Sequence, residues 1–212
     1  MNVKMFTFNA FQENTYVLSD GSNTCVILDP GCSTSEERKA LTDYIEGESL
    51  TPVRLINTHC HIDHILGNDY VSNKWKLPLE AHAGEAVVLD YSKKAAQMYG
   101  IAYDDSPPIA KYIEEGDKIQ WGETTLETYF TPGHSPASLS FFHRDSKQLI
   151  AGDVLFQNSI GRTDLPGGNY DQLIKNIKEK LFPLGDDVVV YSGHGLSTTI
   201  GHEKANNPFL NQ

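Results

Sequence analysis

The sequence predicts an α/β fold in one domain spanning residues 1–212. Three observations point to it. A chain of 212 residues fits one α/β domain with a sizeable core. Short β-rich segments occur in two groups, one in each half of the chain, and segments with helix signals lie between and after them. The sequence contains no internal repeat and no low-complexity segment that would indicate another architecture.

The first half opens with strands. Turn-forming residues separate its β-rich runs, and Asp29-Pro30-Gly31 ends the third run, after which Ser33 or Ser35 can cap a helix. The expected strands are 3–8, 15–19, 25–29 and 53–57, and the expected helices run to about residue 46, from about residue 65, and over 86–98.

The second half repeats this pattern with more strands. Alternating or continuous apolar runs predict strands at 119–121, 124–130, 138–142, 148–151 and 188–191. Helices are expected near 171–181 and 198–205. Pattern alone therefore predicts one α/β domain without specifying how its sheets are arranged.

A cluster of potential metal ligands follows the strand at 53–57. The run Thr58-His59-Cys60-His61-Ile62-Asp63-His64 places His59, His61, Asp63 and His64 within six residues. Imidazole nitrogen and carboxylate oxygen are ligands for borderline and hard divalent cations. On a regular strand His64 would point away from the other ligands, so a tight loop is expected after the strand. The run predicts a metal site at the carboxyl end of a strand, where open α/β sheets carry their sites.

Further ligands come from the second half of the chain. His134, Asp153 and His194 each lie beside glycine and just past the end of a predicted strand. Glycine permits the tight turns that allow a loop to present a side chain to a metal.

These residues together carry a family resemblance. The run Thr-His-x-His-x-Asp-His, with His134, Asp153 and His194 in order, resembles the metallo-β-lactamase superfamily over essentially the whole chain. Within it the chain looks like the small glyoxalase II-like hydrolases, because Asp153 stands where zinc β-lactamases have cysteine. The runs 159–168 and 207–210 also resemble that branch. The resemblance implies a four-layer αββα sandwich.

The resemblance also implies the role of each ligand. His59, His61 and His134 would bind one divalent ion, Asp63, His64 and His194 a second, and Asp153 would bridge them. The expected cofactors are two zinc ions, with iron or manganese as alternatives. The expected reaction is hydrolysis of S-lactoylglutathione or a related small-molecule thioester, with Asp63 as the catalytic residue that orients the nucleophile and manages its proton.

Arg162 is the candidate substrate-binding residue. In the glyoxalase II pattern, a basic residue at the matching position contacts a carboxylate of the substrate, and arginine can do so through two hydrogen bonds. The alternative is a loop arginine paired with Asp164. Asp164 and Leu196 both replace tyrosines of the larger glyoxalase II enzymes, which also carry an additional helical domain, so the thiol carrier of the substrate stays open.

Several other residues have simpler interpretations. A purely structural zinc site would usually close four ligands and favour cysteine, which this cluster does not. Cys60 is expected to be a buried thiol. His82 is expected to cap a helix or lie in the core, and His143 and His202 to lie on the surface.

Composition limits the partners. Acidic residues outnumber basic ones by 28 to 17, a net charge of −11, and no basic run is present, so a nucleic-acid partner is not expected. Three cysteines without paired spacing argue against a disulfide framework. The sequence shows no signal-peptide stretch and no membrane-spanning run, which predicts a cytoplasmic protein. The sequence does not indicate an oligomeric state.

Other functions remain open at this stage. Persulfide dioxygenases share the fold and hold one iron with two histidines and an aspartate, here His59, His134 and Asp153. A lactonase of the same fold is another alternative. A non-catalytic metal-binding module would need a coordination shell that the protein fills completely.

Overall fold

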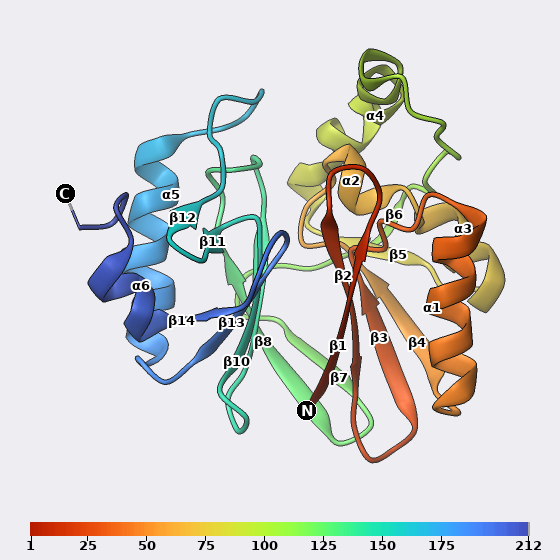
Figure 1. Cartoon of the computed structure of the whole chain (residues 1–212), viewed down its shortest axis with the longest axis horizontal. Helices are drawn as coiled ribbons and strands as arrows, with labels where there is room; N and C mark the ends of the chain where they lie inside the picture. Colours follow the sequence, from red (N-terminus) through yellow and green to blue (C-terminus); the bar gives the residue numbers. More distant parts are fainter. Residues whose placement is uncertain (212) are drawn as a thin grey trace. The chain divides into compact units, whose positions relative to one another are not determined.

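The computed structural model describes residues 1–211, which form two compact units. The first unit comprises Met1–Ile113 and Gln120–Thr125, and the second comprises Glu114–Ile119 and the described residues from Leu126 onward. Each unit contains a β-sheet with helices packed against it (Figure 1). The mixed α/β class predicted from the sequence is confirmed.

The sheet of the first unit is mixed. Strands β1, β2 and β3 pair antiparallel, whereas β3, β4, β5 and β6 pair parallel. Within residues 1–211 the strands of this sheet are hydrogen-bonded in the order β1 (Asn2–Phe8), β2 (Glu13–Ser19), β3 (Thr24–Leu28), β4 (Thr51–Ile56), β5 (Leu79–Ala81) and β6 (Ile109–Tyr112). The carboxyl ends of β3, β4 and β5 therefore lie at one edge.

Helices cover this sheet through an apolar cluster. Leu41 and Ile45 of α1 pack with Val71 of α3 against the strand residues Ile27 and Leu55, all at most 1% exposed. The helical segments of the unit are α1 (Ser35–Gly47), α2 (Ile62–Ile65), α3 (Asn68–Trp75), the 3₁₀ turn η1 (Ala83–Glu85) and α4 (Ala86–Tyr99). Burial of these side chains is the main force that fixes the helices on the sheet.

The cap of α1 differs from the sequence prediction. Thr34, not Ser33 or Ser35, precedes the helix, and its hydroxyl accepts a hydrogen bond from the Glu37 amide at 3.2 Å. The Glu37 carboxylate in turn accepts from the Thr34 amide at 3.0 Å, which completes a capping box. Ser33 donates to the same carboxylate through its backbone and its hydroxyl.

The segment after the ligand motif also differs. The sequence predicted one helix from about residue 65, but the chain forms the short helix α2, breaks, and begins α3 at Asn68. The break lies at Gly67, whose amide donates to the Pro30 carbonyl at 2.7 Å. A side chain at Gly67 would approach Cys32 Sγ to 2.4 Å, so close packing against the loop after β3 requires glycine here.

The second unit is built around another mixed sheet. Within the described residues its order is β14 (Thr198–Thr199), β13 (Val189–Ser192), β10 (Gln148–Gly152), β9 (Leu139–His143), β8 (Thr124–Phe130) and β7 (Lys118–Trp121). β10 and β13 are parallel, and a short hairpin of β11 (Leu155–Phe156) and β12 (Ser159–Ile160) follows β10.

Helices α5 (Tyr170–Asn176) and α6 (Ile200–Asn206) pack on this sheet, with the π-helical turn η2 (Ile177–Leu181) and the 3₁₀ turn η3 (Phe182–Leu184) continuing α5 (Figure 1). Leu173, Ile177 and Leu181 meet Leu149 and Val190 of the sheet, and all five are fully buried. The expected helix at 171–181 is therefore a helix that widens into a π-turn.

One histidine prediction is wrong. His143 ends β9 and is buried at 8% exposure, and its Nδ1 lies 2.6 Å from the Ser146 hydroxyl. His202 is exposed, as predicted. Among residues 1–211, no helix has both the length and the apolar character to cross a membrane.

Candidate metal centre

The first unit brings four of the predicted ligands together. His59 and His61 lie in the loop after β4, whereas Asp63 and His64 lie on α2. The ring of His59 is 4.8 Å from that of His61 and 4.2 Å from that of His64, measured between centroids. Asp63 Oδ2 is 3.7 Å from His64 Nε2. The short helix therefore takes the place of the tight loop that the sequence predicted.

Asp29 organises this cluster from behind. Its side chain is 2% exposed, and Oδ2 lies 3.2 Å from His64 Nδ1 and 2.6 Å from the Thr58 hydroxyl, which donates to it. Asp29 Oδ1 accepts from the Thr58 amide at 2.7 Å. Because a carboxylate accepts hydrogen bonds, His64 carries its proton on Nδ1 and presents the lone pair of Nε2.

A second histidine is oriented through the same carboxylate. The Thr58 hydroxyl gives its hydrogen to Asp29, so its oxygen accepts from His59 Nδ1 at 3.1 Å. His59 is 0% exposed and is thereby fixed with its lone pair on Nε2, the nitrogen available to a metal. One carboxylate thus sets the tautomers of two ligands.

The turn between β1 and β2 braces α2. The Asn9 side chain donates to the carbonyl oxygens of Gly31 and Asp63, each at 3.0 Å. The Glu13 side chain lies behind His64, with Oε1 3.8 Å from Nδ1, and it is fully buried. Burial raises the pKa of the Glu13 carboxyl well above its usual range, while the neighbouring His64 opposes this rise.

The second unit brings the other three predicted ligands together. Asp153 Oδ2 lies 3.4 Å from His134 Nε2 and 3.4 Å from His194 Nε2. Ligands bound at about 2.1 Å in a tetrahedral zinc site lie roughly 3.4 Å apart. His134 Nδ1 donates to the Arg162 carbonyl at 2.8 Å, so the lone pair of the ring lies on Nε2, the nitrogen available to a metal. The donor set and its spacing fit divalent metal ions.

Helix α5 supports the loop that carries His134. The Asn169 amide donates to the Gly133 carbonyl at 2.7 Å, and the Asn176 side chain donates to the Pro132 carbonyl at 2.8 Å. Gly133 has φ of +137° and packs on Leu173, where a side chain would approach backbone atoms to 2.6 Å. The loop therefore needs glycine to lie this close to the helix.

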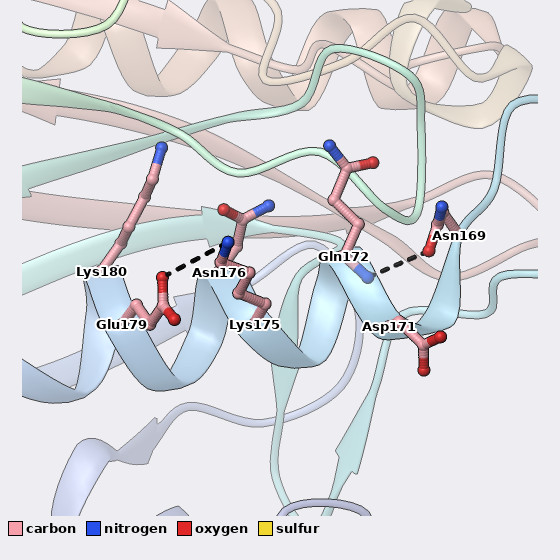
Figure 2. Close-up of a pocket in the computed structure, with 7 residues that line it drawn as sticks. All are labelled: Asn169, Asp171, Gln172, Lys175, Asn176, Glu179 and Lys180. Carbon is pink, nitrogen blue, oxygen red and sulfur yellow. Dashed lines mark hydrogen bonds and ion pairs between the residues drawn. The ribbon is translucent and has the colours of Figure 1, made fainter.

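Figure 2 shows the hollow beside this helix, which encloses about 470 Å³. Two lysines that line it pair with carboxylates, Lys180 with Glu115 at 2.7 Å and Lys175 with Glu179 at 4.0 Å. It contains no histidine or cysteine among its lining residues. Asn169 and Asn176, which support the His134 loop, line this hollow, and none of the candidate ligands does.

The backbone and the side chain of Arg162 make separate contacts. Its carbonyl holds His134, while the guanidinium, 58% exposed, forms two hydrogen bonds with Asp164 at 2.7 and 2.8 Å. Hydrogen bonding from Arg162 lowers the pKa of Asp164 to about 2. The pairing with Asp164 that the sequence offered as an alternative is present.

The remaining sequence predictions concern single side chains. Cys60 is buried, as predicted, and burial raises the pKa of its thiol well above the usual range. Its amide donates to the buried Glu85 carboxylate at 2.8 Å, which fixes the loop between His59 and His61. His82 caps the turn η1, accepting from the Gly84 amide at 3.0 Å, as predicted.

Sequence reasoning missed Asp29 and Glu85 as supports of the ligands. Asp29 carried a usable signal, because it stands past the end of a strand and near a glycine, as Asp153 does. Glu85 carried none, since it lies on a turn after a different strand.

Known proteins support the family assignment. The family model described as "Metallo-beta-lactamase superfamily" matches residues 8–194. A Bacillus subtilis protein called "Probable metallo-hydrolase YqgX" is 43% identical over 94% of this chain and 93% of its own length. "Hydroxyacylglutathione hydrolase GloC" of Haemophilus influenzae is 34% identical over 100% of this chain and 99% of its own.

A solved structure agrees with these relatives. The crystal structure of BLEG-1, described as a B3 metallo-beta-lactamase, superposes with a TM-score of 0.91 and 36% identity, covering 100% of both chains. Members of the family bind divalent metals, in keeping with the histidine-rich donor sets described above. The chain belongs to the metallo-β-lactamase superfamily and is a metallo-hydrolase of that fold.

Proposed function

We propose that this protein is a dinuclear metal-dependent hydrolase that cleaves small-molecule thioesters, in the manner of glyoxalase II. In this proposal His59, His61 and His134 hold one ion, Asp63, His64 and His194 hold the other, and Asp153 bridges them. The observation that carries it is the position of Asp153 Oδ2, at 3.4 Å from the Nε2 atoms of both His134 and His194, because a bridging ligand must reach co-ligands of both ions. The resemblance to GloC supports the thioester substrate.

Zinc is the proposed metal, with iron and manganese as alternatives. When bound, two divalent ions lower the pKa of a water that they share and polarise an acyl carbonyl. The chain's own contribution is orientation: hydrogen bonds to the Nδ1 atoms of His59, His64 and His134 fix the rings before a substrate arrives.

Asp63 is the proposed catalytic residue. Its carboxylate is 14% exposed, whereas the neighbouring His64 ring is fully buried, so Asp63 is the member of this pair that water reaches. Asp63 would orient the attacking water, take its proton and release it to solvent. A thiolate leaves with little help from an acid, because a thiol has a pKa of only about 8.5.

Arg162 is proposed to bind a carboxylate of the substrate. Its guanidinium is exposed and its fork geometry already engages the Asp164 carboxylate through two hydrogen bonds. A substrate carboxylate would replace or share that partner. Asp164 and Leu196 replace tyrosines of the larger glyoxalase II enzymes, so the thiol carrier of the substrate is to be determined by experiment.

The test is hydrolysis of S-D-lactoylglutathione by purified protein whose metal content has been measured. We expect two divalent ions per chain and turnover that Asp153→Ala abolishes, together with a loss of bound metal. The matched control is Asp90→Ala, which removes an exposed carboxylate on α4. Full metal content and full turnover in Asp153→Ala would refute the assignment.

Other substrates separate the alternatives within the fold. Two metals with hydrolysis of an acyl-lactone but not of thioesters would identify a lactonase. Hydrolysis of a β-lactam alone would instead match the description of BLEG-1. One iron per chain with oxygen uptake in the presence of a persulfide would identify a dioxygenase.

A further inference from the structure

Two buried amides stand directly behind the metal ligands of the first unit. Asn57 follows β4 and Asn68 begins α3, and both side chains are 0% exposed. Neither bears a charge or belongs to the donor sets described above. The hydrogen bonds of Asn57 nevertheless reach His64 and the carboxylate that orients it, and those of Asn68 reach Asn57.

Asn57 holds His64 from two sides. Its side-chain nitrogen donates to the His64 carbonyl at 3.0 Å and to Asp29 Oδ1 at 3.2 Å. Asp29 Oδ2 in turn accepts from His64 Nδ1 at 3.2 Å. The backbone of α2 and the imidazole ring are therefore tied to a single amide group.

Asn57 is itself fixed. Its backbone amide donates to the Glu80 carbonyl at 3.0 Å, and its side-chain oxygen accepts from Asn68 Nδ2 at 2.7 Å. The amide of Asn57 thus uses its oxygen and its nitrogen at once, which leaves the side chain a single orientation. A buried group satisfied in this way is costly to rotate.

Asn68 extends these contacts to a loop. Its side-chain nitrogen also donates to the Ser106 hydroxyl at 2.9 Å. Ser106 lies in the segment 101–108 between α4 and β6, which carries no helix or strand. The Ser106 amide donates to the Tyr103 hydroxyl at 3.0 Å, which also accepts from Ser92 of α4.

We propose that Asn57 and Asn68 are positioning residues that hold His64 in its metal-binding orientation and couple metal binding to the order of the segment 101–108. The inference rests on the proposed function, since it requires His64 to bind a metal. Metal binding that fixes His64 also fixes the side-chain amides of Asn57 and Asn68. Because coupling between two binding or ordering events is reciprocal, order in the segment 101–108 in turn stabilises the orientation of His64.

The main test measures zinc affinity by competition with a chromophoric chelator, with Zn²⁺ as the only ligand. Asn57→Asp keeps the size of the side chain but places a second carboxylate 3.2 Å from Asp29 and removes both donated hydrogen bonds. Loss of an outer support of a metal ligand typically lowers metal affinity about 10- to 100-fold, and we expect a decrease in this range.

Asn68→Ala is the second variant, because it touches neither His64 nor Asp29 and is therefore expected to fold if Asn57→Asp does not. The matched control is Asn207→Ala, another fully buried amide, which donates to Ser159 and Glu203 and to none of the metal ligands. We expect Asn68→Ala to weaken zinc binding several-fold and Asn207→Ala to leave it within twofold of wild type.

Hydrogen exchange supplies a readout independent of activity. Zinc is expected to slow amide exchange in the segment 101–108 of the wild type, and Asn68→Ala is expected to abolish this slowing. Unchanged zinc affinity in Asn57→Asp and Asn68→Ala, or an equal loss in Asn207→Ala, would overturn the inference. Failure of the wild type to bind zinc, iron or manganese would overturn the proposed function itself, so the two failures are distinguishable.

Discussion

Gly161 offers the sharpest test of how the ligands of the second unit are held. It follows β12 and is buried, and its amide donates to the Val154 carbonyl at 3.3 Å. A Cβ atom at this position would lie 1.9 Å from the Asp153 carbonyl oxygen and 3.0 Å from His134 Cβ. Gly161→Ala therefore requires the backbone of Asp153 and the side chain of His134 to shift, and both residues are candidate ligands.

The cost of this substitution follows from the nature of the contact. The nearest atom belongs to the backbone and cannot rotate away, so the strain should match the overpacking of a core, about 1–3 kcal/mol. In a chain of this size each kcal/mol lowers Tm by roughly 2–4 °C, so a decrease of about 2–12 °C is expected. Zinc affinity should also fall, because Asp153 and His134 shift together.

Thermal unfolding with and without zinc measures both effects. Gly21→Ala is the matched control, because a Cβ there meets nothing within 4 Å and the residue is exposed. If Gly161→Ala kept the Tm and the zinc affinity of the wild type, the close approach to Asp153 would not determine the position of the ligands.

Three further predictions concern the stability and chemistry of the fold. Arg54→Met should destabilise the protein by roughly 3 kcal/mol in denaturant titrations, because the buried Glu80 carboxylate loses a guanidinium whose Nε lies 3.2 Å from both carboxylate oxygens. The control is Arg144→Met, which breaks an exposed ion pair and should cost less than about 1 kcal/mol. Equal losses of stability in the two variants would contradict this prediction. The native thiols should not react with a disulfide reagent at pH 8, because burial raises the pKa values of Cys25 and Cys32 to about 12 and that of Cys60 well above its usual range; rapid labelling before unfolding would refute this. Hydrogen bonds from Ser22 and Thr124 outweigh desolvation and lower the pKa of Asp20 to about 2. The ionised Asp20 carboxylate therefore stabilises the fold above about pH 4, and this stabilisation is lost as the pH falls towards 2. Asp20→Asn should flatten the decline of the unfolding free energy between these pH values, and an unchanged decline would contradict the prediction.

The candidate ligands could be picked out from the sequence because their signals are local. The motif is visible because its four candidate ligands lie within six residues, at His59, His61, Asp63 and His64. Strand patterns place each of the later candidates, His134, Asp153 and His194, just past the end of a strand. Within each unit the candidate ligands lie close to one another, and their role as metal ligands stays a prediction. The strands that the sequence predicted lie within a few residues of their observed positions, since buried strands carry continuous apolar runs, whereas the short strands β6, β11, β12 and β14 were not predicted.

The contacts that these supports make were not predictable, even where a residue such as Asp29 carried a signal, because they depend on pairing between distant segments. Asp29 and Asn57 meet because β3 and β4 are neighbours in a parallel sheet, which no local pattern reveals. The break before α3 depends on the contact of Gly67 with Pro30, and the burial of His143 depends on its place at the end of β9. Each of these is a tertiary effect that overrides local propensity.

The register of β3 and β4 has a consequence for how such an enzyme can change over time. Leu28 pairs with Ile56, so the backbone ladder places Asp29 beside Asn57 and Thr58 whatever the surface loops do. A hydrogen-bonded ladder cannot slip by one residue without turning every side chain of the strand to the other face. The carboxylate that orients His59 and His64 is thereby anchored in the least changeable part of the unit, and exposed side chains such as Val87 and Met98 of α4 can vary without disturbing it.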